Sequence, residues 1–352
     1  MDVQNDLQGW LNRFSCPAFS VKENIITACN HSAEALLLNP GMDIRDLLMT
    51  GADEYAQFDS GCLYLKLKLT PRGCGASVTR EGDANLFLLD QQPEDADLRS
   101  LALAARELRS PLSNLMIAAD ALKQGTADDP NLSEQLARLN RSLHQMHRLI
   151  NNMSDAGRSD LLSPTGIHDL NRLFQDIFEK IQTQLEKTRI CVTFEGLGQS
   201  IYGVANEGQL ERAVLNIVSN AMKFMPEGGS IHARLTRQQN MLHLSILDSG
   251  SGIAETVLGN VFTRYQRQPG IEDSRYGIGL GMVLIRSAAA DHGGTVLIDF
   301  PEEKGTRITM TMAIRQDAPA LRTPVISPAA DSNRQILTEL SDCLSWEFYQ
   351  KN

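Results

Sequence analysis

Two runs of apolar residues with heptad spacing dominate residues 98 to 153. The first run advances by alternating steps of three and four residues: Leu98, Leu101, Ala105, Leu108, Leu112, Leu115, Ala119 and Leu122. The second run, after a break at 125–130, follows the same rule: Leu132, Leu136, Leu139, Leu143, Met146, Ile150 and Met153. This repeat predicts two long helices that form an antiparallel hairpin over residues 96–156. One hairpin alone leaves its seams too exposed, so we expect two chains to pair as a homodimer with a four-helix bundle.

The composition is that of an ordinary globular protein. Hydrophobic residues make up 42% of the 352 residues and charged residues 22%, which is enough to build two or three domains. The formal net charge of -10 argues against binding to nucleic acid or to an anionic membrane surface, so the partners are expected to be proteins or small molecules. No segment has the roughly 18 consecutive apolar residues of a membrane span. The six cysteines include no Cys-x-x-Cys pair, which favours reduced thiols and a cytoplasmic location over a disulfide framework or a zinc site.

Residues 1–92 show the pattern of a small α+β module. Short strands are predicted at 19–21, 25–28, 76–78 and 86–89, and residues 62–69 alternate with the period of a half-buried strand. A short helix is expected at 32–38. The run from Pro17 to Val21, followed by Ile25, Asn30 and Ala33, resembles the opening of a PAS sensor domain. An unrelated small α+β module is the alternative interpretation.

The C-terminal half contains one larger domain and a terminal helix. Residues 164–315 alternate helical and strand patterns, which predicts an α/β domain. Residues 316–330 contain three prolines and are interpreted as a linker. Residues 331–352 can form an amphipathic helix with one apolar stripe: Ile336, Leu340, Leu344 and Phe348. This helix could pack back on the body of the protein or dock a partner, and the sequence favours neither.

A polar stripe is predicted on a helix around residue 220. Asn216, Asn220 and Lys223 are spaced so that they share one helical face. Magnesium prefers oxygen ligands, so amide oxygens together with phosphate oxygens can hold it, and a lysine can serve as a point charge on the phosphates. Taken alone, the stripe also fits a polar helix face that binds nothing.

Two glycine-containing segments follow this stripe. An apolar strand ends at Asp248, whose carboxylate can only accept hydrogen bonds and therefore suits the exocyclic amine of adenine. Gly250 and Gly252 let the backbone approach a flat ligand. A second group of glycines precedes a predicted helix at 283–290: Gly277, Gly279 and Gly281. The free N–H groups and the positive end of such a helix suit phosphates.

Together these segments resemble the ATP-binding domain shared by histidine kinases, gyrase, mismatch-repair ATPases and one chaperone family. The resemblance assigns Asn216 and Asn220 to the N box, 248–252 to the G1 box, 262–265 to the F box and 277–281 to the G2 box. The later His292-Gly293-Gly294 run and Gly305-Thr306 are similar to the histidine-kinase branch in particular. It implies an α/β sandwich that binds ATP and Mg²⁺, with Asn220 as the metal ligand and a mobile lid at 254–276. The implied nucleotide-binding residues are Asn216, Asn220, Lys223, Phe224, Asp248, Gly250, Gly252, Phe262, Gly277, Gly279, Leu280, Gly281 and Thr306.

The segment Arg106-Glu107-Leu108-Arg109-Ser110-Pro111-Leu112 resembles the phospho-acceptor box of histidine protein kinases, with Arg106 in place of the acceptor histidine. Transfer of phosphate needs an imidazole nitrogen with a free lone pair. A guanidinium stays protonated because its pKa exceeds about 12, so Arg106 can bind phosphate oxygens but is a very poor nucleophile. Pro111 is expected to bend the helix. His144 and His147 are conceivable substitute acceptors, although both are expected to be solvated residues flanking the second seam.

Three functions compete on this pattern. The first is a regulatory pseudokinase that binds ATP and signals through its conformation or a partner. The second is an enzyme, with Glu107 and Ser110 as the residues that matter: a phosphatase of a response-regulator receiver domain, or the catalytic partner of another kinase chain that carries the histidine. In family members of the phosphatase type, an acidic residue and a Thr or Asn three positions later orient a water, and Ser110 occupies that later position. A non-kinase ATPase of the gyrase type is disfavoured by the helical hairpin and the acidic charge.

Overall fold

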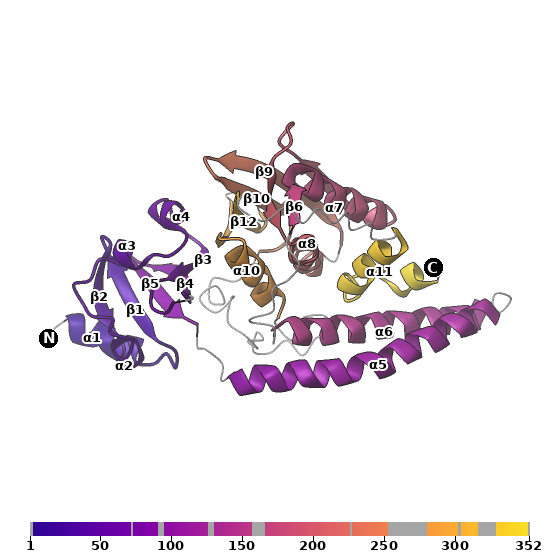
Figure 1. Ribbon diagram of the computed structural model, residues 1–352, viewed down its shortest axis with the longest axis horizontal. Helices are drawn as coiled ribbons and strands as arrows, with labels where there is room; N and C mark the ends of the chain where they lie inside the picture. Colours follow the sequence, from indigo (N-terminus) through magenta and orange to yellow (C-terminus); the bar gives the residue numbers. More distant parts are fainter. Residues whose placement is uncertain are drawn as a thin grey trace.

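The computed structural model describes residues 3–71, 73–90, 95–125, 130–156, 166–225, 227–252, 280–301, 304–315 and 329–350. Its helices and strands form a small mixed module, a long helical hairpin and a second mixed module in chain order (Figure 1). The α+β multidomain class predicted from the sequence is confirmed. No helix in these ranges is long and apolar enough to cross a membrane.

The N-terminal module is a five-stranded antiparallel sheet with helices on both faces. Its elements are α1 (Val3–Leu11), β1 (Ala18–Lys22), β2 (Ile25–Cys29), α2 (His31–Glu34), α3 (Ile44–Leu47), α4 (Ala52–Ala56), β3 (Cys62–Leu67), β4 (Cys74–Glu81) and β5 (Ala84–Leu89). The strand order is β2-β1-β5-β4-β3. Leu11 of α1 packs on one face, while α2, α3 and α4 cover the other face.

The predicted strands of this module are all present, and the predicted helix is shorter than expected. The helix at 32–38 is α2, which ends at Glu34. Leu37 has a φ of 64°, a left-handed conformation that no α-helix can contain. Asn30 caps α2 and is itself buried, with its amide nitrogen donating to the carbonyl of Cys16 at 2.8 Å.

The helical hairpin consists of α5 (Asp95–Gly125) and α6 (Pro130–Ala156), which lie antiparallel and side by side (Figure 1). Only part of the predicted seam is buried within one chain. The buried contact consists of these apolar side chains: Ala105, Leu112, Met116, Ala119, Leu143 and Ile150. Other seam residues are exposed by about half, including Leu108 at 48% and Leu115 at 53%. The side chains of Leu98 and Leu101 lie outside the described residues.

The C-terminal module has a five-stranded sheet of its own. Its elements are β6 (Gly166–Asp169), α7 (Leu170–Leu185), β7 (Ile190–Glu195), β8 (Tyr202–Ala205), α8 (Glu207–Lys223), β9 (Gly229–Gln238), β10 (Met241–Asp248), α10 (Gly281–Asp291), β11 (Val296–Asp299) and β12 (Arg307–Ala313). The order is β11-β12-β10-β9-β7, and β6 pairs separately with β8. The apolar faces of α7, α8 and α10 share one core with this sheet.

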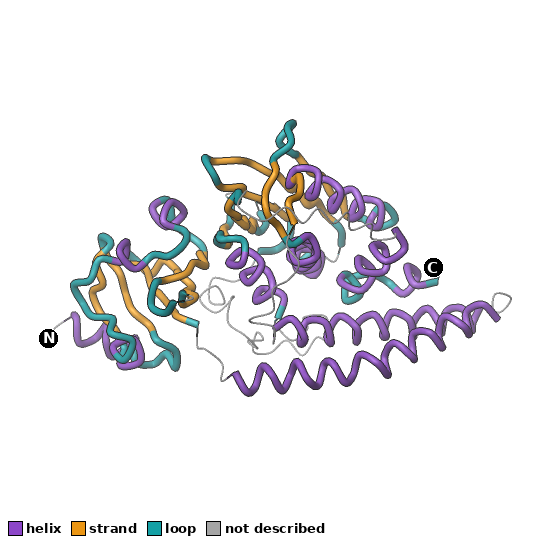
Figure 2. Tube along the Cα trace, in the orientation of Figure 1, coloured by secondary structure: helices purple, strands orange, loops and turns teal. Residues whose placement is uncertain are grey.

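The two sheets join into one. β3 pairs antiparallel with β11, with Tyr64 opposite Val296 and Cys62 opposite Ile298. Figure 2 shows the strands of both modules in orange. Because side chains alternate along a strand, Cys62 and Tyr64 belong to the core of the C-terminal module while Leu63 belongs to that of the N-terminal module. No pattern in the sequence predicted this junction.

The chain returns to the hairpin at its C-terminal end. The α11 helix (Ala329–Glu339) is followed by a turn and by η2, a 3₁₀ helix (Trp346–Tyr349), and these elements contact α6, α7 and α8. The expected single helix over 331–352 is therefore wrong in extent: the Ser341 hydroxyl donates to the carbonyl of Thr338 at 2.7 Å where the helix ends. Most of the predicted linker at 316–330 lies outside the described residues.

Candidate functional site

The polar face of α8, defined as Asn216, Asn220 and Lys223, lies against the start of α10. Asn206 caps α8 by accepting from the backbone N–H of Gln209 at 3.0 Å, which fixes the helix at its first turn. Asn216 is fully buried, and its Oδ1 lies 3.1 Å from the position that a Cβ would take at Gly281. The structure therefore brings the predicted N box next to the first residue of the helix that follows the glycine-rich segment.

Asn220 has an oxygen available for a cation. Its Nδ2 lies 3.5 Å from Sδ of Met282, which leaves Oδ1 without a hydrogen bond among the described residues. An amide oxygen is a suitable magnesium ligand, and the remaining ligands would be phosphate oxygens and water. The residues present therefore fit the predicted magnesium role of Asn220.

Asp248 lies at the end of β10 and is nearly buried. Its Oδ1 accepts two backbone N–H groups, from Gly250 at 2.8 Å and from Thr306 at 3.2 Å. Burial raises the pKa of this carboxyl, while these two N–H donors lower it. Within the described part of the chain, Oδ2 makes no hydrogen bond, so it is the oxygen that can accept from the amine of a ligand.

Glycines around Asp248 leave the room that its segment needs. Gly305 has a φ of 135°, and a Cβ there would lie 1.9 Å from the carbonyl oxygen of Asp248. At Gly250 a Cβ would meet Asp248 Oδ1 at 2.8 Å and the carbonyl oxygen of Phe224 at 3.2 Å. Gly252 has a φ of 80°. Side chains at Gly305 and Gly250 would collide with the segment that carries Asp248, so these positions require glycine.

The first turn of α10 offers uncapped backbone donors. Leu280 is the N-cap residue, is 2% exposed, and forms no side-chain cap. Among the described residues, the first N–H groups of the helix that begins at Gly281 therefore have no capping side chain, which suits an anion. The predicted F-box residue Phe262, the glycines Gly277 and Gly279, and the lid at 254–276 lie outside the described residues.

Lys223 does not face open solvent. Its side chain is 9% exposed, and Nζ lies 3.6 Å from Oδ2 of Asp342 in the C-terminal segment, residues 333–350. Burial and the nearby Arg148 lower the pKa of Lys223, while Asp342 raises it. The predicted phosphate contact is thus already paired with a carboxylate from the same chain.

A buried cluster of charges links α6, α8 and the C-terminal segment. Arg148 donates from Nη1 to Oδ2 of Asp342 at 2.6 Å and from Nη2 to Oδ1 of Asn216 at 3.4 Å. Glu339 lies 3.4 Å from both Arg148 and Arg212. Sequence reasoning missed this cluster, because its partners come from segments 194 residues apart and carry no motif.

His292 joins the two helices of the site. Its Nδ1 lies 2.7 Å from the carbonyl oxygen of Ala288, and its Nε2 accepts from the backbone N–H of Asn206 at 3.1 Å. A ring that donates at Nδ1 and accepts at Nε2 is neutral, in keeping with burial, which lowers the pKa of His292. The histidine of the His-Gly-Gly turn therefore holds the beginning of α8 against the end of α10.

The predicted acceptor segment lies on an exposed side of α5. Arg106, Glu107 and Ser110 are all exposed, and Ser110 follows Arg106 by one turn. The expectation that His144 is solvated is wrong: it is 8% exposed, and its Nδ1 lies 2.7 Å from Oγ1 of Thr338. The C-terminal helix covers it. His147 is half-buried, and burial together with nearby arginines lowers its pKa.

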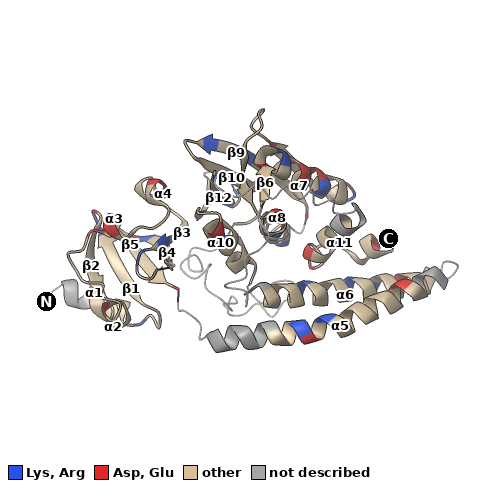
Figure 3. Ribbon diagram, in the orientation of Figure 1, with Lys and Arg blue, Asp and Glu red and all other residues tan. Residues whose placement is uncertain are grey.

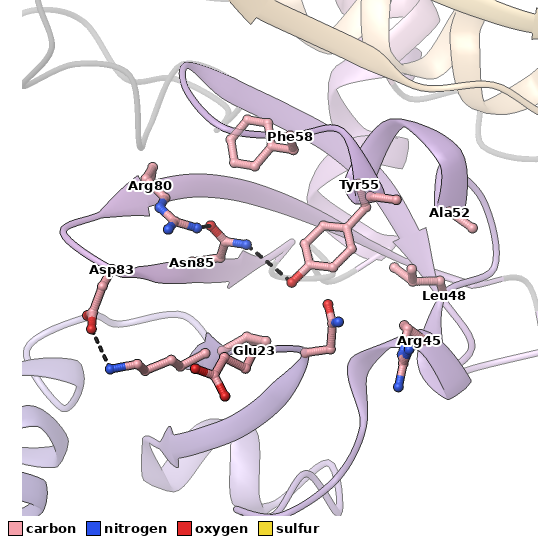
Figure 4. A pocket seen from close by; sticks show the side chains of 13 residues that line it. Glu23, Arg45, Leu48, Ala52, Tyr55, Phe58, Arg80, Asp83 and Asn85 are labelled. Carbon is pink, nitrogen blue, oxygen red and sulfur yellow. Dashed lines mark hydrogen bonds and ion pairs between the residues drawn. The ribbon is translucent and has the colours of Figure 1, made fainter.

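The N-terminal module contains a cavity of about 850 Å³. It opens between the β1–β2 turn, α3, α4 and the β4–β5 turn. In Figure 4, Tyr55 is directed toward Asn85, whose Nδ2 donates to the tyrosine hydroxyl at 3.2 Å. Arg80 donates to Asn85 Oδ1 at 3.1 Å, and Leu48 and Phe58 supply apolar lining.

Contacts between the two modules reach α10. Arg286 of α10 forms an ion pair with Asp90, and its guanidinium lies 5.0 Å from the ring centroid of Tyr64. Glu54 of α4 accepts from the hydroxyls of Thr295 at 3.2 Å and Thr311 at 3.0 Å. The helix whose N-terminus lies in the candidate site is thus held at its middle by the N-terminal module.

Comparisons with known proteins agree with this geometry. A family model described as histidine kinase-, DNA gyrase B- and HSP90-like ATPase matches residues 205–316, and one described as the His kinase A (phospho-acceptor) domain matches residues 98–162. The histidine protein kinase DivJ of Caulobacter vibrioides is 29% identical over 258 residues, which cover 68% of this chain and 41% of that protein. The adaptive-response sensory kinase SasA of Crocosphaera subtropica is 30% identical over 229 residues, which cover 61% of this chain and 58% of that protein.

The chain spans about half the length of these curated relatives. Among solved structures, full-length ShkA in complex with AMPPNP is 21% identical, with a TM-score of 0.50 over 68% of this chain and 54% of that one, which supports the fold. The phospho-acceptor and ATPase models match in the order that the hairpin and the C-terminal module follow along the chain. On this evidence the chain belongs to the histidine protein kinase family.

Proposed function

We propose that this protein is a regulatory pseudokinase of two-component signalling, which binds ATP with Mg²⁺ but does not phosphorylate itself at the usual position. The observation that carries the proposal is Arg106: an arginine occupies the acceptor position on an exposed side of α5, while the ATPase-type domain retains its polar helix face and its buried aspartate. A protonated guanidinium has no lone pair with which to attack the γ-phosphate.

The nucleotide would be held by groups that the fold already orients. Asp248 would accept from the adenine amine through Oδ2, and the uncapped N–H groups at Gly281 would meet the phosphates. Mg²⁺, held by Asn220, would neutralise the phosphate charge. Ten of the thirteen expected nucleotide-binding residues lie in described segments, and the F box and lid would complete the site.

We also propose a homodimer. Leu108 and Leu115 of α5, with Leu139 and Met146 of α6, are each about half exposed and recur every seven residues. A second hairpin would bury them in a four-helix bundle. The change Leu115→Glu should give a monomer in sedimentation equilibrium, whereas an unchanged mass would contradict this interface.

A cytoplasmic location is also proposed, because all six cysteines are free thiols.

The N-terminal module is proposed as the sensor, with its cavity as the entry for a small molecule. The cavity is lined by both charged and apolar groups, which suits a small amphipathic compound. A metabolite that raises the melting temperature of the wild type but not of Arg80→Leu would support this role. A screen in which no compound distinguishes the two proteins would contradict it.

A second function is favoured by one observation. Ser110 is exposed one turn after Arg106, so its hydroxyl could orient a water toward a phosphorylated receiver domain. Loss of phosphate from an added response regulator, abolished by Ser110→Ala, would favour a phosphatase. Labelling of a histidine on a partner kinase, abolished by Asn220→Ala, would instead favour a catalytic partner.

The test of the main proposal is incubation of the purified protein with labelled ATP and Mg²⁺. Nucleotide should bind, measured by equilibrium dialysis, and no acid-labile phosphate should remain on the protein. Label on the wild type that disappears in the double variant of His144→Ala and His147→Ala would contradict the proposal, because a substitute acceptor would then exist.

A further inference from the structure

The C-terminal segment, defined as residues 333–350, packs between α6 and α8 and contacts both helices. In Figure 1 it lies above α6 and beside α8. Five of its apolar side chains are almost fully buried: Ile336, Leu337, Leu340, Leu344 and Tyr349. They belong to the core cluster that also contains the apolar residues of α8. The segment is therefore part of the folded body.

Polar side chains of α6 fix the turn that follows α11. Arg141 donates from Nε to the carbonyl of Ser341 at 3.1 Å and from Nη2 to the carbonyl of Asp342 at 3.2 Å. Gln145 donates to the same carbonyl of Ser341 at 3.3 Å. These bonds satisfy carbonyls at the end of a helix and position the side chain of Asp342.

Asp342 is directed at two cations, Arg148 of α6 and Lys223 of the polar face of α8. Its Oδ2 lies 2.6 Å from Nη1 of Arg148 and 3.6 Å from Nζ of Lys223. Both cationic side chains are less than 10% exposed, so each needs an anion. Figure 3 shows basic residues in blue and acidic residues in red over these elements. In the structure, the Asp342 carboxylate supplies that anion.

A nucleotide phosphate would compete for the same cation. Lys223 belongs to the same helical face as Asn216 and Asn220, and Arg148 connects Asp342 to Asn216 through its other nitrogen. Because the Lys223 ammonium is nearly buried beside the Asp342 carboxylate, a phosphate brought to it would be repelled by that carboxylate, so the phosphate has to displace Asp342. Neutralising Asp342 should therefore favour whichever anionic ligand approaches Lys223.

We propose that the C-terminal segment is an internal ligand of the nucleotide site, in which the Asp342 carboxylate holds the Lys223 ammonium that a nucleotide phosphate would take. This inference rests on the proposed function, since ATP would have to bind at the site in which the family resemblance assigns Lys223 to a phosphate. ATP binding then requires Lys223 to exchange Asp342 for phosphate. Because the same segment contacts α6 through Arg141 and Arg148, the exchange also links nucleotide occupancy to the hairpin.

The test compares nucleotide affinities of the full chain by calorimetry, with Mg-ATP and with adenosine as probes. Asp342→Asn preserves shape but removes the competing charge, and we expect it to bind Mg-ATP about tenfold more tightly, within the usual range of couplings between sites. Adenosine carries no phosphate, so its affinity should not change. The matched control is Glu347→Gln, which removes one exposed carboxylate of the same segment and should change neither affinity.

The outcomes of this experiment distinguish failure of the inference from failure of the proposed function. If the wild type binds Mg-ATP and Asp342→Asn binds it equally or less tightly, the inference fails while the proposed function stands. If Asp342→Asn tightens ATP and adenosine equally, the site has merely loosened and the competition is refuted. If no variant binds nucleotide, both the proposed function and this inference are overturned.

A measurement on the wild type keeps the inference testable should Asp342→Asn fold poorly. The amides of Cys343 and Leu344 donate to the carbonyl of Leu340 at 2.9 and 3.0 Å in the turn that carries Asp342. Displacement of Asp342 by phosphate should speed the hydrogen exchange of these amides when Mg-ATP is added. Unchanged or slower exchange would contradict the proposal.

Discussion

The junction between β3 and β11 makes a sharp prediction at Gly61. This residue has a φ of 86°, and a Cβ there would lie 2.1 Å from the carbonyl oxygen of Ile298 and 3.1 Å from Cα of Asp299. Both atoms belong to β11, on the other side of the junction. The change Gly61→Ala should therefore push β3 away from β11 and separate the two modules locally, without disturbing the hairpin or the nucleotide site.

The magnitude has two parts. A left-handed conformation costs alanine about 1–2 kcal/mol. Loss of the ladder over three registered residue pairs, at roughly 1 kcal/mol per hydrogen bond, adds about 2–3 kcal/mol. The total is about 3–5 kcal/mol. Gly82 provides a matched control, because it has a φ of 63° but no atom within 4 Å of the added Cβ. Gly82→Ala should cost only the first part.

Urea denaturation measures the total, and hydrogen exchange followed by mass spectrometry locates it. In Gly61→Ala the amides of β3 and β11 should exchange roughly 30- to 160-fold faster, the factor that corresponds to 2–3 kcal/mol of local opening. In Gly82→Ala they should exchange as in the wild type. Equal losses of stability in the two variants, with unchanged exchange at β11, would refute the continuous sheet.

Three further changes test the site and its supports. Asp248→Asn should keep the fold, because an amide oxygen still accepts from Gly250 and Thr306, but should weaken ATP binding by at least about tenfold, since its Nδ2 would face the adenine amine; an unchanged dissociation constant in calorimetry would exclude the assigned role. Burial lowers the folded-state pKa of His292. The neutral ring therefore contributes its full share of stability above the unfolded-state pKa of about 6.5. That contribution declines as the pH falls below that value, by at most about 1.4 kcal/mol per pH unit. In unfolding experiments from pH 7 to pH 5, His292→Gln should therefore lose less stability than the wild type; parallel curves would contradict a buried neutral ring. Leu340→Ala should destabilise the protein by about 2–5 kcal/mol, because Leu340 is fully buried, and a loss below about 1 kcal/mol would show that the C-terminal segment is not docked in solution.

Local patterns in the sequence were sufficient for the elements and for part of the site. Alternation predicted β3, and heptad spacing predicted α5 and α6 to within a few residues. The spacing of Asn216, Asn220 and Lys223 placed them on one face of α8, because helical periodicity depends only on neighbouring residues. The shorter backbone contact of Asp248 is also local, since Gly250 is two residues away, whereas Thr306 comes from 58 residues further along the chain.

Features that depend on pairing between distant segments escaped prediction. The junction of β3 with β11 joins strands more than 200 residues apart, and nothing in the alternation of a strand identifies its neighbour. The burial of His144 depends on Thr338, which approaches only because the chain returns to α6. The pairing of Lys223 with Asp342 has the same origin, so a residue predicted to meet phosphate was found beside a carboxylate.

We propose that Arg106 alone removes self-phosphorylation from a chain that otherwise has the hairpin and the ATP-binding domain of a histidine kinase. The most direct measurement is labelling by [γ-³²P]ATP of the wild type and of Arg106→His, which restores an imidazole beside Glu107 on the exposed side of α5. The wild type should bind ATP and take no acid-labile label, whereas Arg106→His should become labelled. Acid-labile label on the wild type, at a level unchanged by Arg106→His, would contradict it.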